Sequence, residues 1–128
     1  MPQFTLRQLQ HESDAWKRVL VIMGEENVEL KNRLSEILKS DIDKKLLMKA
    51  ENFQNSFVVE DDLIRFLRND IASFDRLINR GNWEDGVAIL ELTEKLRIIR
   101  ASLVNTEKRF NDLKFEFNSF LLQYTSSR

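Results

Sequence analysis

Residues 89–124 read ILELTEKLRIIRASLVNTEKRFNDLKFEFNSFLLQY, and this stretch decides the fold. Its apolar residues recur in steps of three and four, the spacing that brings side chains to one face of a helix. The stripe consists of Ile89, Leu92, Leu96, Ile99, Leu103, Thr106, Phe110, Leu113, Phe117, Phe120 and Tyr124. An alternation kept for this long is typical of a coiled coil rather than of an ordinary globular helix. The pattern predicts a helix from about Trp83 to Tyr124.

Two further stripes of the same kind come earlier in the chain. The first contains Leu6, Leu9, Ser13, Trp16, Leu20, Met23, Asn27, Leu30, Leu34 and Ile37, and predicts a helix from about Thr5 to Lys39. The second contains Leu46, Ala50, Phe53, Phe57, Glu60, Ile64, Leu67, Ile71, Phe74 and Ile78, and predicts a helix from about Ile42 to Arg80. Long helices joined by short turns pack as antiparallel neighbours. We therefore expect an all-α, up-down bundle of three long helices.

Capping residues mark the two turns. Ser40 and Asp43 resemble a capping box, which would start the second helix. Gly81 can adopt the left-handed conformation that ends a helix, and Asn82 can cap the next. An alternative remains open at Asn55-Ser56, where two capping-type residues precede Val58 and Val59. A break there would split the second helix and give a bundle of four helices.

The composition is that of one folded domain covering residues 1–128. The chain is 42% hydrophobic and 32% charged, with a net charge of −1 and no cysteine. Because acidic and basic residues are mixed along the helices, no basic stripe is present for nucleic acid. No stretch has the run of about 18 apolar residues that spans a bilayer, and the first ten residues do not resemble a signal peptide. We expect a cytoplasmic protein without nucleic-acid or membrane partners.

The residues needed for most enzyme chemistry are missing. His11 is the single histidine, and without cysteine it has no partner for nucleophilic catalysis or for a transition-metal site. A phosphotransfer role for His11 is disfavoured by the acidic residues that follow it. Glu60, Asp61 and Asp62 are consecutive, so on a helix they point in different directions and cannot all bind one cation. We therefore predict a non-enzymatic protein with no metal and no cofactor.

Three polar residues interrupt the core stripes, one on each helix. With the helices matched about the two turns, residue i of the first lies level with about residue 83 − i of the second and i + 81 of the third. This rule sets Asn27 level with about Ser56 and Lys108, and places Asn27, Glu60 and Thr106 within about one helical turn. We expect a buried polar layer that fixes helix register, with a ligand pocket or a switch as the alternative.

Several apolar residues fall outside the core stripes and are candidates for an interface. Ile22 and Phe66 lie on outer helix positions at similar heights, and Phe115 and Leu122 are one heptad apart on the third helix. Exposed apolar patches usually mark binding surfaces. These residues predict a helical protein–protein interaction module, with a homodimer as its simplest form. The alternative is a small helical chaperone or ligand carrier that uses a groove near the polar layer.

In layout, the expected bundle resembles a spectrin repeat or the regulatory three-helix domains of membrane-fusion proteins. The resemblance rests on three long helices and on Trp16, which points inward from the first. It covers the architecture alone. It therefore implies a three-helix bundle and carries no function over.

Overall fold

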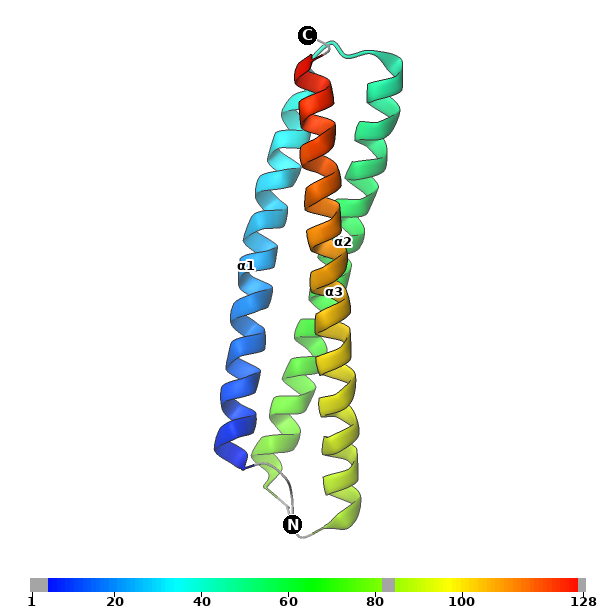
Figure 1. Ribbon diagram of the computed structural model, residues 1–128. Helices are drawn as coiled ribbons and strands as arrows, with labels where there is room; N and C mark the ends of the chain where they lie inside the picture. The colour runs from blue at the N-terminus through cyan, green and yellow to red at the C-terminus, as the bar shows by residue number, and fades with distance from the viewer. Residues whose placement is uncertain (1–4, 82–84, 127–128) are drawn as a thin grey trace.

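The computed structural model describes residues 5–81 and 85–126, and nearly all of them are helical. Helix α1 spans Leu6–Lys39, α2 spans Lys44–Arg80 and α3 spans Gly86–Ser126. The helices run up, down and up along one rod (Figure 1). The predicted all-α bundle of three long helices is confirmed.

The three helices pack unequally. Helix α1 makes its most extensive contact with α2, α2 also packs on α3, and α1 and α3 touch each other least. The helices cross at shallow angles, so that α2 passes behind α3 in Figure 1. The first turn of α1 and the last turn of α3 lie at opposite ends of the rod.

The core follows the predicted stripes closely. Trp16 packs edge-on against Phe74 with ring centroids 5.2 Å apart, which joins α1 to α2. Nearer the other end, Phe57 and Phe117 meet edge-on at 5.1 Å. Phe53 contacts Phe117 at 5.2 Å and extends this aromatic cluster. Such rings bury large apolar areas, so the cluster is a main source of stability between α2 and α3.

The helix ends differ in part from the prediction. Helix α1 begins with a capping box in which Thr5 and Gln8 exchange hydrogen bonds. Ser40 caps the end of α1 instead of starting α2, because its hydroxyl donates to the carbonyl of Ile37 at 2.6 Å. The start of α2 is capped by Asp43, which accepts from the backbone N–H of Lys45 at 2.7 Å. The predicted capping box at Ser40 is therefore wrong.

The other turn signals have mixed outcomes. Gly81 ends α2 with a φ of 67°, in the left-handed region that favours glycine, as predicted. The predicted cap at Asn82 and the predicted helix start at Trp83 lie outside the described residues. Helix α2 continues through Asn55 and Ser56 without a break, so the four-helix alternative is wrong.

Candidate functional site

The polar group at the middle of the bundle is built around Asn27. Its side chain is fully buried, and its amide nitrogen donates to the main-chain carbonyl of Phe57 at 3.0 Å. The same nitrogen donates to the carboxylate of Asp61 at 2.7 Å. Asp61 also accepts a charge-assisted bond from Lys31 at 2.6 Å. Because Phe57 and Asp61 flank Glu60 on α2, these bonds seat Asn27 in the core layer of Glu60.

The same arrangement occurs a second time, two heptads nearer the start of α1. The buried hydroxyl of Ser13 donates to Asp75 at 2.6 Å. Lys17 forms an ion pair with the other oxygen of Asp75, also at 2.6 Å. In both places a core polar residue and a lysine of α1 share one aspartate of α2. Only one alignment of α1 with α2 satisfies both groups, so together they fix the register.

The second group was not recognised from the sequence, although a signal was present. Ser13 and Asn27 both interrupt the first stripe, and both are followed four residues later by a lysine. The matching aspartates, Asp75 and Asp61, have the same two-heptad separation on α2. This repeated spacing could have predicted the register.

The observed register corrects the predicted one. Asn27 lies among Phe57, Glu60 and Asp61, and not level with Ser56, so the predicted match between α1 and α2 is wrong by about four residues. The shift is the same along the helices, because Ser13 with Asp75 and Asn27 with Asp61 have the same offset between α1 and α2.

Thr106 lies one core layer from Asn27 and Glu60. Glu26 on α1 pairs with Lys114 on α3, 88 residues further along the chain. In a parallel coiled coil, an ion pair of this kind joins a residue beside the core of one helix to a residue of the next heptad of the other helix. The second residue lies about five positions beyond the residue that is at the same height as the first. Residue i of α1 is therefore level with about residue i + 83 of α3, close to the predicted i + 81. On this match, Asn27 is level with about Phe110. Thr106 is buried and lies four residues before Phe110 on α3, which is about 6 Å along the helix axis.

Two buried oxygens in the layer of Asn27 and Glu60 have no hydrogen-bond partner. They are Oδ1 of Asn27 and Oε1 of Glu60. Both are acceptors, so neither can satisfy the other while Glu60 is ionised. An unpaired buried acceptor costs about 1–3 kcal/mol, and more when it is charged. The layer therefore lacks a hydrogen-bond donor.

Burial shifts the titration of Glu60. Its side chain is 2% exposed, and loss of solvation raises its pKa to about 6. The positive charge of Arg109 lowers the pKa and the negative charge of Asp61 raises it, but burial has the largest effect. Glu60 is thus the acid in this layer that can gain a proton under mildly acidic conditions.

Glu60 also lines a groove between α2 and α3. The groove has a volume of about 330 Å³, and is lined by Asn55, Ser56, Val59, Glu60, Arg109, Asp112, Leu113 and Glu116. Three carboxylates and one guanidinium give it an acidic balance. This groove is the candidate small-molecule site of the bundle.

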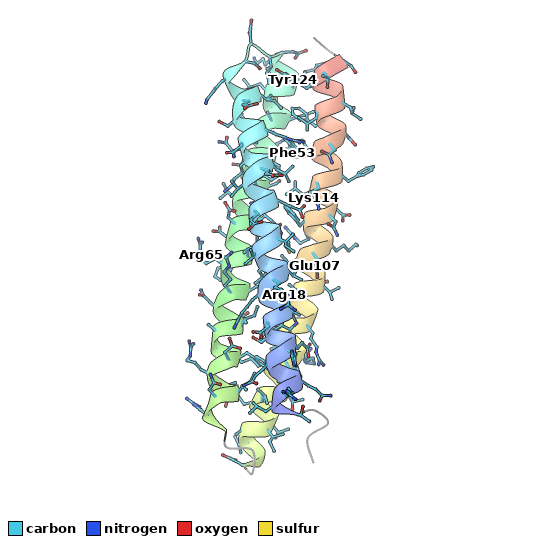
Figure 2. All side chains as sticks on the ribbon, turned by 90° about the vertical axis from the view of Figure 1, so that its left-hand side faces the viewer. Arg18, Phe53, Arg65, Glu107, Lys114 and Tyr124 are labelled. Carbon is cyan, nitrogen blue, oxygen red and sulfur yellow. The ribbon has the colours of Figure 1, made fainter. Side chains whose placement is uncertain are left out.

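The α1–α3 face is the candidate protein-binding surface. Val19, Ile22 and Met23 of α1 and Phe110 of α3 line a shallow groove of about 200 Å³ along it. A broader hollow of about 670 Å³ continues over α3, and its lining is Thr93, Leu96, Arg97, Arg100, Ala101, Val104 and Asn105. Figure 2 shows Glu107 and Lys114 on the side of α3 nearest α1, where they border this face.

The four predicted interface residues are all exposed but do not form one patch. Ile22 is 54% exposed on the α1–α3 face. Phe66, 63% exposed, is one heptad from Val59, which lines the groove between α2 and α3. Phe115 and Leu122 form a separate strip along α3 and are both more than 70% exposed. Ile22 and Phe66 therefore share a height but lie on different faces.

No metal-holding group is found in the part of the chain that the structure describes. His11 is exposed, and no group of three acidic or histidine side chains in residues 5–81 and 85–126 is placed to hold a metal ion. No helix in the same ranges is long and apolar enough to cross a bilayer.

Comparisons with known proteins identify no relative. No protein-family model, no curated protein and no solved structure matches the chain.

Proposed function

We propose that this protein is a non-enzymatic interaction module that associates with a second copy of itself through the α1–α3 face. The supporting observation is that apolar side chains are open to solvent where the helices of the bundle contact each other least. Ile22 and Val104, 54% and 65% exposed, flank this face on α1 and α3. Burying them would remove apolar area worth about 25 cal/mol per Å².

The charges beside the apolar residues favour a second copy over an unrelated partner. On α3, Ser102 lies midway along the sequence between Arg97 and Glu107. A two-fold axis at the height of Ser102 would make the two α3 helices antiparallel and set Arg97 of one protomer opposite Glu107 of its partner. The Arg97–Glu107 contact then forms twice, once from each protomer, as a two-fold interface requires.

Sedimentation velocity tests the proposal. The unmodified protein should sediment as a dimer at ~100 μM, a concentration that populates even weak micromolar dimers. The double variant Ile22→Ser with Val104→Ser should be monomeric, with unchanged helical circular dichroism. The matched control, Phe66→Ser with Phe115→Ser, also removes two exposed apolar residues but leaves the α1–α3 face intact, and should remain dimeric.

A charge reversal tests the geometry of the dimer. Arg97→Glu should weaken association, because it sets two acids opposite each other in both symmetric contacts. The double variant Arg97→Glu with Glu107→Arg should restore association by reversing each pair. If the unmodified protein is monomeric at ~100 μM, self-association is excluded. If the control variant dissociates and the α1–α3 variant does not, the face is wrong.

We propose the cytoplasm as its location, since a chain without cysteine suits a reducing compartment. The second candidate function is a small helical ligand carrier. One observation favours it: the groove between α2 and α3 is lined by Glu60, whose buried oxygen has no partner.

A further inference from the structure

We propose that the groove between α2 and α3 binds an aliphatic diammonium, a short alkane with a cationic amine at each end. The proposal deepens the ligand-carrier candidate and names its ligand class. It is independent of self-association, because none of the residues that line the groove belongs to α1.

Glu60 is the first reason to expect a cation with hydrogen-bond donors. Glu60 is one of the residues that line the groove, its side chain is 2% exposed, and its oxygen Oε1 has no hydrogen-bond partner. A buried carboxylate is stable only with donors or an opposite charge. An alkylammonium supplies both, since it carries a full positive charge and three N–H donors with no acceptor.

The groove lining is the second reason. Glu60, Asp112 and Glu116 outnumber Arg109, so the groove attracts cations and repels anions. A metal ion is disfavoured, because within the described ranges no three such ligands converge on one point. An organic cation is larger and can contact charges that are spread along the groove.

The placement of apolar and acidic residues in the groove favours a ligand with a positive charge at each end. Val59 of α2 and Leu113 of α3 provide apolar contacts that suit methylene groups. Asp112 and Glu116 lie one helical turn apart, about 6 Å along the exposed surface of α3. One ammonium would bind Glu60 at the base of the groove, and the other would bind this pair of carboxylates at the rim. The volume of about 330 Å³ is at the small end of the range for ligand sites.

Arg109 is the competitor that the ligand must displace. Its charge already acts on Glu60, and its guanidinium has five donors that could approach the carboxylate. Asp61 of α2 also acts on Glu60 and is paired with Lys31 of α1, and Asp112 and Glu116 of α3 line the groove. Removing Arg109 should therefore strengthen diammonium binding.

The test is a titration with 1,4-diaminobutane, followed by ¹⁵N-resolved NMR at constant ionic strength and pH 7.5. We expect saturable shifts confined to residues 55–60 and 109–116. The neutral analogue 1,4-butanediol has the same carbon chain and should give no saturable shifts. Affinity should fall about tenfold at pH 5, because a Glu60 with a pKa of about 6 is then mostly protonated and neutral.

Three variants complete the test. Glu60→Gln should abolish saturable binding, whereas Glu29→Gln, at an exposed position of α1, should leave the affinity unchanged. Arg109→Gln should bind more tightly than the unmodified protein. Circular dichroism and dispersed NMR spectra would show that each variant is folded.

Several results would overturn the proposal. Shifts that grow linearly with 1,4-diaminobutane, or that 1,4-butanediol reproduces, would show that no diammonium site exists. Equal affinity in Glu60→Gln would remove Glu60 from the site. Weaker binding in Arg109→Gln would show that Arg109 does not compete with the ligand. None of these results bears on the oligomeric state, so this proposal and self-association fail separately.

Discussion

Oδ1 of Asn27 on α1 and Oε1 of Glu60 on α2 are unpaired acceptors in the same core layer. Protonation of Glu60 changes this balance, because a neutral carboxyl group is itself a donor. It also removes the cost of keeping a charge away from solvent. The layer is therefore better satisfied when Glu60 is protonated.

This relationship predicts how stability depends on pH. The pKa of Glu60 is about 6 in the folded protein and near 4.5 when it is unperturbed, so the folded state binds the proton more tightly. The contribution of Glu60 to stability is present below pH 4.5 and is lost as the pH rises through 6, by about 2 kcal/mol. Glu60→Gln should remove this dependence and be more stable than the unmodified protein at pH 8. Urea unfolding from pH 4.5 to 8 measures the difference between the two proteins, and parallel curves would contradict the prediction.

Replacing both Asn27 and Glu60 by leucine should separate stability from register. The double variant should unfold at a higher temperature, because it removes two unpaired buried acceptors, each of which costs about 1–3 kcal/mol. With one of the two register-fixing groups removed, the helices should also slide more readily. Faster amide exchange in the middle of α1, despite the higher melting temperature, would demonstrate this. Slower exchange throughout would show that Ser13 and Asp75 fix the register alone.

Phe117 and Phe115 provide a matched pair for the core. Phe117 is fully buried in the aromatic cluster, and Phe115, two residues earlier on α3, is 74% exposed. Phe117→Ala should lower the free energy of unfolding by about 3–5 kcal/mol, through lost burial and the cavity it leaves. Phe115→Ala should change it by less than about 0.5 kcal/mol. Chemical denaturation of the monomer measures both, and similar losses would contradict the packing of α3.

Gly81 and Gly86 test the turn between α2 and α3. A Cβ at Gly81 would meet no close atom, so Gly81→Ala is penalised through its φ of 67°, by about 1–2 kcal/mol. Gly86 begins α3, has no positive φ and has open space around it. Gly86→Ala should be neutral or stabilise by up to about 1 kcal/mol, because alanine favours helix. Thermal unfolding should show a lower melting temperature for Gly81→Ala and no decrease for Gly86→Ala.

The continuity of the helices could be predicted, because the core stripe of each helix keeps its spacing of three and four residues from end to end. The alternative at Asn55-Ser56 failed for a local reason. The hydroxyl of Ser56 donates to the carbonyl of Asn52 within α2 at 3.1 Å, so it supports the helix that it could have interrupted. A capping residue ends a helix only where the apolar stripe also ends, and here the stripe continues through Phe57.

The grouping of surface residues could not be predicted, for a geometric reason. The stripes determine which side of each helix faces the core, but two mirror-related positions for α3 satisfy the same stripes. The choice between them decides which flanks of α1 and α2 share a face. In this bundle Ile22 lines the groove between α1 and α3, whereas Val59, one heptad from Phe66, lines the groove between α2 and α3.

The ends of the rod have a mechanical consequence. The first turn of α1 and the last turn of α3 lie at opposite ends, so a pull applied through Leu6 and Ser126 acts along the helix axes (Figure 1). Such a load shears α1 past α2 instead of peeling it away. Both aspartate-centred groups, at Asp61 and Asp75, lie across that shear plane and must break together before the helices slide. The same bonds that set the register therefore oppose sliding of α1 past α2 under tension.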